Sequence, residues 1–548
     1  MLKDLPIGTS NFRELINKKQ YYVDKTEMIE NLLKQTNAVS LFPRPRRFGK
    51  SLFISMLDNF FNIEYKDRNK NLFDGLYISK SEFYNNLSTR PVIKLNFRDL
   101  KKNTYEEMFN KFKEMIMQVY KGKKYIYNSL DELDKRMFDS FINKTADYDN
   151  YCNSVKYLTE MMYKYYGMNV VVLIDEYDVP IETGYINKYY KKVVSLIRDV
   201  FSSALKDNDF LDFGIMTGVL RVSKESLFSD FNNPKIYTII DKNYNEAFGF
   251  TTEETKELLN YYNLELNEDV KNMYDGYNFG GKEIYNPWSI INYAHSLDLV
   301  PYWVNTSGNE LIFSTVKNCE SDIKVKIEKL LLGESLEFIY NDKTTYQDYS
   351  DYNDSDKILN LLLASGYLTI EKRINKNFNI EMTYVKLPNR EVRYLFSQIL
   401  LKILTEGNRI DLKKVTDFCD GIFENDKEAI EEVLNQMLPK LSYHDLNESG
   451  YHNYVMALFT LFINDNNYLV YSNRESGMGR FDIMIKDKQF NKGIIIEFKV
   501  TKDDLEKSAI NALNQIEEKE YYLDLVNEGY KEIIKYAIVF KGKTCIVR

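Results

Sequence analysis

The stretch from Asn37 to Asp58, NAVSLFPRPRRFGKSLFISMLD, decides the fold of the N-terminal half of this chain. It opens with an apolar run, Ala38 to Phe42, that is typical of a short buried strand, and it closes with apolar residues at helical spacing. A basic loop ending in Gly49-Lys50-Ser51 joins the two. Strand, loop and helix in this order predict a phosphate-binding loop, in which helix-start N–H groups, a lysine and a serine hold phosphate and Mg²⁺.

We therefore expect this loop to bind ATP with Mg²⁺ as cofactors. The residues expected to bind nucleotide are Arg46, Arg47, Gly49, Lys50, Ser51 and Leu52, with Ser51 also a ligand of Mg²⁺. Gly-Lys-Ser alone also occurs by chance at helix starts, so the surrounding pattern carries the prediction. The loop departs from GxxxxGK[ST] because Arg44 stands at the first glycine position, and two prolines stiffen it. Its three arginines add positive charge near the expected phosphates, for ATP or for another anion.

A second strand supplies the acids that a phosphate loop needs. The apolar run Val170 to Ile174 ends in Asp175 and Glu176, as a central parallel strand does where it opens on a ligand crevice. We expect Asp175 to hold Mg²⁺ and Glu176 to orient the attacking water. The alternative is a strand that ends in a solvated turn.

A third strand of this kind is predicted from Phe213 to Thr217. Thr217 is placed like the polar residue that senses the terminal phosphate in ATPases with a phosphate-binding loop. Arg221 follows, and we expect it either to contact phosphate, in the same or a neighbouring subunit, or to form a surface salt bridge.

The C-terminal hundred residues carry a second pattern. Two predicted strands, Gly479 to Ile485 and Ile494 to Val500, read as a hairpin, and alternation puts Glu497 and Lys499 on one face. Asp482 on the preceding strand can converge with them. Carboxylates are hard oxygen ligands for Mg²⁺ or Mn²⁺, and a lysine can orient the attacking water in phosphodiester cleavage. The alternative is the polar face of a half-exposed strand.

We expect Glu497 and Lys499 to be catalytic and Asp482 and Glu497 to bind the metal. Glu448, four residues before His452 on a predicted helix, is expected to complete the metal's outer ligands.

Composition limits the functions available. The 548 residues suffice for three or four domains, and the net charge of −8 means that any nucleic-acid contact must come from local basic patches. The four cysteines are scattered and there are three histidines, which argues against disulfides or a zinc site. Without a signal-peptide pattern or a long apolar run, the expected location is cytoplasmic.

The middle region, 244 to 435, reads mostly as helices. FGFTTEETKELL carries a Thr-x-x-Glu capping signature that suggests a helical lid. ILNLLLASGYLTI and the following FNIEMTYVKLPNREV predict a helix and a β-hairpin, the outline of a winged-helix-like unit. Its helix is rich in leucine and poor in basic residues, which favours a structural connector over a DNA reader.

Several sequence segments together resemble those of one protein family: RPRRFGKSL, LIDEYDVP, TGVLRVSKESLFSDFNN, YDGYNFGGKEIYNPWSIINY and YWVNTSGN. They are similar to the bacterial AAA-ATPase-like proteins that carry a C-terminal nuclease-like domain. The resemblance implies an ATPase core with an additional strand and a catalytic glutamate. The D…ExK arrangement resembles the PD-(D/E)XK nuclease superfamily, with Phe481 at the usual proline, and implies a supporting role for Gln515.

The sequence therefore predicts an α/β protein of three parts. These are a P-loop ATPase-like parallel-sheet domain (1–243), a helical lid and connector (244–435), and a restriction-endonuclease-like α/β domain (436–548). ATP at the first would control metal-dependent cleavage at the last. The alternative is a nucleotide-switched regulatory or binding protein whose nuclease fold does not cut. Expected partners are nucleic acid, DNA before RNA, and a second copy of the chain, but no membrane.

Overall fold

The computed structural model describes residues 2–35, 37–206, 208–220, 234–303, 321–331, 333–341, 354–376, 380–405, 411–441, 447–462, 468–472, 475–476, 478–487 and 490–548. The chain forms two compact units. The first consists of Met1–Asn318 and Glu337–Asn389, and the second of Cys319–Leu336 and Arg390–Arg548.

The first unit is built on a five-stranded parallel sheet. Its strands are β1 (Val39–Pro43), β2 (Val92–Asn96), β3 (Val170–Asp175), β4 (Leu211–Gly218) and β5 (Pro234–Ile236), in the order β2-β3-β4-β1-β5. β1 and β3 are buried along their whole length, as apolar runs in a parallel sheet covered on both faces should be. β4 lies between β1 and β3, so the additional strand implied by the resemblance is present.

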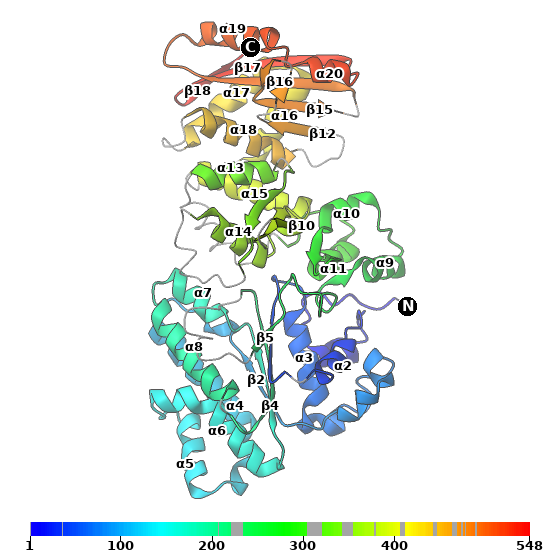
Figure 1. Cartoon of the computed structure of the whole chain (residues 1–548), viewed down its shortest axis with the longest axis vertical. Coiled ribbons are helices and arrows are strands. Elements are labelled where there is room, and N and C mark those ends of the chain that lie inside the picture. Colours follow the sequence, from blue (N-terminus) through cyan, green and yellow to red (C-terminus); the bar gives the residue numbers. More distant parts are fainter. Residues whose placement is uncertain are drawn as a thin grey trace. The chain divides into compact units, whose positions relative to one another are not determined.

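Helices cover both faces of this sheet (Figure 1). Helix α3 (Lys50–Phe61) packs on one face, and α4 (Tyr105–Gly122), α6 (Tyr148–Tyr166) and α8 (Tyr190–Leu205) pack on the other. The remaining helices of this part are α1 (Phe12–Asn17), α2 (Glu27–Leu33), α5 (Glu132–Ile142) and α7 (Val179–Ile186). The strands predicted from Ala38 to Phe42, Val170 to Ile174 and Phe213 to Thr217 are confirmed as β1, β3 and β4.

Two smaller elements complete the first unit. The segment predicted as a helical lid contains β6 (Phe250–Thr251), α9 (Thr252–Tyr261), α10 (Glu268–Tyr274), β7 (Tyr277–Phe279), β8 (Lys282–Tyr285) and α11 (Pro287–Ser296). Thr251 and Glu254 form the predicted capping box. The predicted helix and hairpin are α14 (Ser355–Ala364), β10 (Thr369–Lys376) and β11 (Ile380–Lys386), with β9 (Leu336–Ile339) beside β11. The leucines of α14 are buried, which explains its apolar composition.

The second unit pairs a helical layer with a mixed sheet. Its helices are α13 (Ser321–Leu331), α15 (Arg390–Leu404), α16 (Leu412–Glu424), α17 (Lys427–Met437), α18 (Glu448–Phe462), α19 (Leu505–Glu518) and α20 (Leu523–Asn527). The sheet order is β12 (Tyr468–Ser472), β15 (Ile483–Asp487), β16 (Lys492–Val500), β17 (Glu532–Lys541) and β18 (Thr544–Val547). A separate small hairpin pairs β13 (Glu475–Ser476) with β14 (Gly479–Arg480). The predicted hairpin is β15–β16, and β17 pairs with β16 on one side and β18 on the other.

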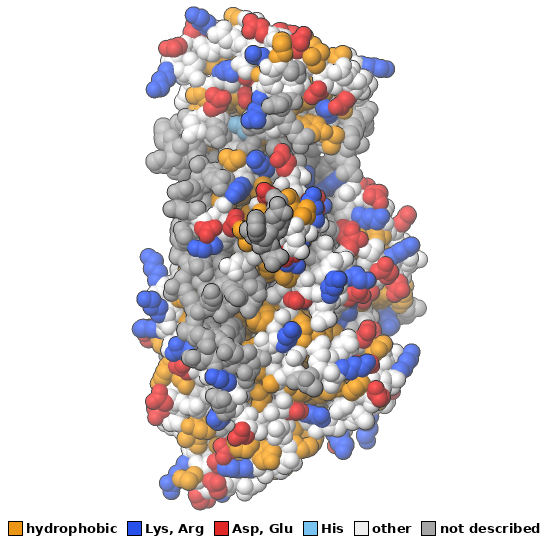
Figure 2. All heavy atoms as spheres, in the orientation of Figure 1, with side chains coloured by type: hydrophobic (Ala, Val, Ile, Leu, Met, Phe, Trp, Pro, Cys, Tyr) orange, Lys and Arg blue, Asp and Glu red, His pale blue; other side chains and the backbone are white. Residues whose placement is uncertain are grey.

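The surface carries charges of both signs. On the face drawn in Figure 2, basic and acidic side chains of the described residues are interspersed. Cys152, Cys419 and Cys545 are buried free thiols. Over the described part of the chain, no helix has the length and apolar character needed to cross a membrane.

Candidate functional site

The phosphate loop folds around the ammonium group of Lys50, the first residue of α3. Lys50 Nζ donates hydrogen bonds to the carbonyl oxygens of Arg44 (2.9 Å) and Pro45 (2.8 Å). Gly49 caps the helix with a φ of +89°, in the left-handed region that favours glycine. The loop thus presents the N-terminus of α3, where free backbone N–H groups attract an anion.

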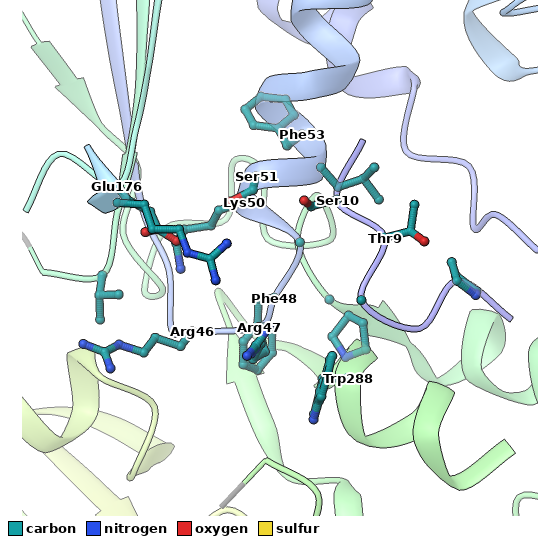
Figure 3. Close-up of a pocket in the computed structure, with 18 of the residues that line it drawn as sticks. Thr9, Ser10, Arg46, Arg47, Phe48, Lys50, Ser51, Phe53, Glu176 and Trp288 are labelled. Atoms are coloured by element: carbon teal, nitrogen blue, oxygen red, sulfur yellow. The ribbon is translucent and has the colours of Figure 1, made fainter. Parts of the chain in front are cut away.

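A cavity of about 740 Å³ opens at this helix terminus. Gly49, Lys50, Ser51 and Leu52 line it from the loop and the first turn of α3, and Glu176 lines it from the end of β3. Figure 3 shows Glu176 beside Lys50, with Thr9 and Ser10 approaching from a separate segment of chain. The segment before the loop therefore contributes to the wall of this cavity.

Asp175 and Glu176 stand in different surroundings at the end of β3. Asp175 is buried, and its Oδ1 accepts a hydrogen bond of 2.7 Å from the hydroxyl of Thr217. Glu176 has a left-handed φ of +54° and is half-buried. Burial and the neighbouring Asp175 raise the pKa of Glu176, and Lys50 opposes that shift. A carboxylate with a raised pKa is a better proton acceptor.

Of the two residues predicted near the terminal phosphate, Thr217 and Arg221, the structure describes only Thr217. Thr217 is fully buried, and its hydroxyl is directed to Asp175 on the neighbouring strand. Arg221 lies outside the described residues.

Sequence reasoning missed Asp178, a third acid near Lys50. Its Oδ2 accepts hydrogen bonds from the N–H groups of Val219 (2.8 Å) and Leu220 (2.9 Å), which ties the end of β3 to the end of β4. Burial lowers the pKa of Lys50 to about 8, against the opposing charges of Asp178, Glu176 and Asp175. The signal was present as the third acid of Asp175-Glu176-Tyr177-Asp178.

The three arginines of the loop do not act alike. The expectation that all three add charge near the phosphates is wrong for Arg44, which is fully buried. Its guanidinium donates to the carbonyl oxygens of Pro43 (2.9 Å), Tyr237 (2.5 Å) and Tyr244 (3.2 Å). Arg44 therefore holds the loop from its buried side. Arg46 and Arg47 do line the cavity. Arg46 forms a 2.8 Å ion pair with Glu182, and the Arg47 guanidinium lies 4.4 Å above the ring of Trp288.

The helix–hairpin element packs directly on the loop, a contact that sequence reasoning did not foresee. Trp303 Nε1 donates a hydrogen bond of 3.2 Å to the carbonyl oxygen of Arg46, and the Tyr367 ring lies 5.1 Å from that of Trp303. A Cβ atom added to Gly366 would lie 2.6 Å from Cβ of Pro45. The loop is therefore held from its outer side as well.

In the second unit, Asp482, Glu497 and Lys499 come together as predicted from the hairpin. Asp482 Oδ2 accepts a hydrogen bond of 2.6 Å from the N–H of Phe498, next to Glu497 on β16. Lys499 Nζ donates to Oε1 of Glu497 at 2.8 Å. Gln515, on α19, donates to the same oxygen at 2.6 Å, which matches the supporting role implied by the resemblance.

Burial dominates the electrostatics of this group. It raises the pKa of Glu497 to about 7, with a further contribution from Asp482 and opposition from Lys499. Burial also raises the pKa of Asp482, against the N–H of Phe498 and the charge of His452. For Lys499 burial lowers the pKa, but the hydrogen bond and charge of Glu497 outweigh it and leave the value above normal.

The donor set suits a hard divalent cation. Oε2 of Glu497 is buried and has no hydrogen-bond partner, an unsatisfied position that a cation would fill. Mg²⁺ is commonly bound through one or two carboxylates with several waters. In the described residues no three His, Cys, Asp or Glu side chains gather into a metal site by themselves.

Glu448 and His452 lie on α18, as the spacing predicted. Glu448 is exposed, and its charge raises the pKa of both Asp482 and Glu497. His452 is buried, with Nε2 2.9 Å from the Ser472 hydroxyl and 3.3 Å from the carbonyl oxygen of Asp482. His452 therefore positions the chain at Asp482.

Tyr521 is a further member that sequence reasoning missed. The Gln515 Nε2 atom that contacts Glu497 also donates to the Tyr521 hydroxyl at 3.0 Å. Phe481, at the usual proline position, packs in the core with Tyr521. Only the fold brings Tyr521 to the site, because it follows the end of α19.

Comparison with known proteins agrees with this architecture. Residues 6–228 match the family described as predicted AAA-ATPase, and residues 446–548 match the PD-(D/E)XK nuclease superfamily. An "Uncharacterized protein in vnfD 5'region" from Azotobacter chroococcum mcd 1 is 24% identical over 530 residues, covering 95% of this chain and 93% of that protein. No solved structure matches the chain.

Proposed function

We propose that this combination of an AAA-ATPase-like domain and a PD-(D/E)XK nuclease superfamily domain is an ATP-controlled, metal-dependent nuclease. ATP with Mg²⁺ binds at the phosphate loop, and nucleic acid, DNA before RNA, is cleaved at Asp482, Glu497 and Lys499. The observation that carries the proposal is the buried, unpartnered Oε2 of Glu497 beside Lys499 and Asp482.

At the first site, Lys50 and the N-terminus of α3 neutralise the phosphates, and Ser51 and Asp175 supply ligands for Mg²⁺. Glu176, with its raised pKa, holds and orients the attacking water. Arg46 and Arg47 contribute positive charge at the wall of the cavity. Arg221, which follows β4, remains a proposed phosphate contact.

At the second site, Asp482 and Glu497 would hold Mg²⁺ or Mn²⁺, with Glu448 among the outer ligands. The metal, when bound, stabilises charge on the phosphate oxygens and lowers the pKa of its bound water. Lys499 is placed by its hydrogen bond to Glu497 and bears the charge that offsets the developing anion. Gln515 holds the Glu497 carboxylate in place from α19.

The test is cleavage of labelled duplex and single-stranded DNA and RNA by the full chain in Mn²⁺ or Mg²⁺, with and without ATP. Lys499→Ala should abolish cutting but keep ATP binding. Lys50→Ala should remove the effect of ATP on cutting. Lys531→Ala, at an exposed lysine of the nuclease-like domain, is the matched control and should behave as wild type.

Two results would overturn this proposal. If Lys499→Ala still cut nucleic acid, cleavage would not take place at this site. Absence of cutting on every substrate, with ATP still bound, would instead support a nucleotide-switched binding or regulatory protein.

A further inference from the structure

We infer that Met478, Arg480 and Lys519 form a strand-binding rim, a surface that holds the backbone of a nucleic-acid strand beside Asp482. The inference rests on the proposed nuclease function and assigns residues that bind the substrate.

The rim is anchored to the turn that follows α19. The hydroxyl of Ser476 donates to the carbonyl oxygen of Tyr521 at 2.8 Å, and the N–H of Met478 donates to the carbonyl oxygen of Lys519 at 2.8 Å. A Cβ atom on Gly479 would lie 3.1 Å from the Tyr521 ring and 3.4 Å from Cδ of Lys519. These contacts hold β14 and the Lys519 side chain next to each other.

The rim exposes groups that have no role inside the fold. Met478 is 65% exposed, a large fraction for an apolar side chain held in place by its backbone. Arg480 and Lys519 are exposed, and neither has an ion-pair partner among the described residues. By contrast, Lys535 and Lys486 nearby in the same domain are paired with Glu517 and Glu528. Arg480 stands opposite Glu475 in the β13–β14 pair. Within the described residues, two cations without an ion-pair partner and one exposed apolar side chain therefore lie in one short stretch of surface, which suits a phosphate–sugar backbone.

The rim also lies at the edge of the candidate site. Arg480 ends β14 and stands two residues before Asp482, whose carboxylate is held on β16 by the N–H of Phe498. Tyr521, against which Gly479 packs, is connected through Gln515 to Glu497. A strand on the rim would therefore run past the two carboxylates.

Charge explains why such a rim is needed. Asp482 and Glu497 repel a phosphate, and the chain as a whole carries a net charge of −8. Glu518 and Glu520 flank Lys519 in the sequence and weaken its attraction. Arg480 is the stronger contact, because a planar guanidinium can bind a phosphate through two parallel hydrogen bonds. Met478, an adaptable apolar side chain, would pack against the sugar or base between them.

The experiment measures binding of fluorescently labelled single-stranded and duplex DNA to the full chain by anisotropy, over a range of salt concentrations, with Ca²⁺ as the divalent ion. The double variant Arg480→Ala/Lys519→Ala should bind about tenfold more weakly, and the slope of log affinity against log salt should fall by about 2, since each lost phosphate contact removes about 1. Arg480→Lys should keep the salt slope of wild type but bind more weakly, because an ammonium group keeps the charge and cannot form the two parallel hydrogen bonds of a guanidinium. Lys531→Ala, at an exposed lysine far along the sheet, is the control and should match wild type.

The outcomes separate the two proposals. If wild type binds DNA and the double variant binds equally well with the same salt slope, the rim is wrong and the nuclease proposal stands. If wild type neither binds nor cuts nucleic acid, the nuclease proposal fails and the rim fails with it. Thermal unfolding of each variant, compared with Lys531→Ala, excludes loss of the fold as the cause.

Discussion

The side-chain amide of Gln515 donates a 2.6 Å hydrogen bond to Oε1 of Glu497, which joins helix α19 to strand β16. The same nitrogen donates to the Tyr521 hydroxyl, so both N–H groups of the amide have an acceptor. This leaves Oε2 of Glu497 as the unpartnered oxygen. The relationship makes Gln515 a positioning residue for the proposed metal.

Gln515→Ala should weaken Mn²⁺ binding by about 10- to 100-fold, the usual effect of losing a hydrogen bond to a metal ligand. Isothermal titration calorimetry of the full chain measures the affinity. Gln436→Ala is the matched control, because Gln436 makes a hydrogen bond of 3.0 Å to Glu432 on the surface of α17. Equal Mn²⁺ affinity in Gln515→Ala and Gln436→Ala would contradict the positioning role.

Metal affinity should depend on pH around neutrality. The pKa of Glu497 is about 7, whereas its ordinary value is 4.5, and a metal binds the deprotonated carboxylate. Between about pH 6 and pH 8 the charged fraction rises roughly tenfold, so Mn²⁺ affinity should rise by about the same factor. Calorimetric titration with Mn²⁺ at both pH values measures this rise. Glu497→Gln should bind Mn²⁺ weakly and without this dependence on pH.

The same shift has a consequence for stability without metal. Because the folded state holds the Glu497 proton more tightly than the unfolded state, this residue's contribution to stability falls as pH rises from about 4.5 through 7. Urea unfolding of the metal-free chain should show this loss, and Glu497→Gln should reduce it. A pH dependence that is the same in both proteins would contradict the shift.

Thr217→Val tests the pair formed with Asp175. Valine has the shape of threonine but cannot donate, so a buried carboxylate oxygen loses its partner, at a cost of about 1–3 kcal/mol in the free energy of unfolding. Urea unfolding measures it. Thr255→Val is the control, since the buried Thr255 hydroxyl donates to a carbonyl oxygen of its own helix end, Thr251. Equal losses in both variants would indicate no special role for the Asp175 contact.

Gly366→Ala tests the contact between the helix–hairpin element and the phosphate loop. Its Cβ would meet Pro45 at 2.6 Å, and overpacking of this kind costs about 1–3 kcal/mol. Gly281→Ala is the control, because Gly281 has a similar φ (+88° against +84°) but open space around it. Binding of a fluorescent ATP analogue should weaken in Gly366→Ala and remain near wild type in Gly281→Ala. If both variants bound the ATP analogue as wild type does, the contact of the helix–hairpin element with the loop would have no effect on nucleotide binding.

Much of the fold could be read from local patterns. Continuous apolar runs predicted β1 and β3, the Thr251 capping signature predicted the start of α9, and the alternation around Glu497 predicted the β15–β16 hairpin. These features depend on the periodicity of apolar residues and on the backbone preferences of neighbouring residues. Both can be recognised from the sequence without the tertiary structure. The roles of the site residues themselves stay predictions.

The amino-acid sequence by itself predicted the division into an ATPase-like, a helical and a nuclease-like part, the loop at Lys50 and the D…ExK pattern, since each shows in the residue types and periodicity of short stretches of chain. The tertiary structure alone decided that Arg44 is a buried anchor, that Thr217 pairs with Asp175, and that Tyr521 reaches Glu497 through Gln515. It also placed Gly366 on Pro45. The physical reason is that these contacts join residues distant in the chain, and only the order of strands and the packing of side chains brings them within bonding distance.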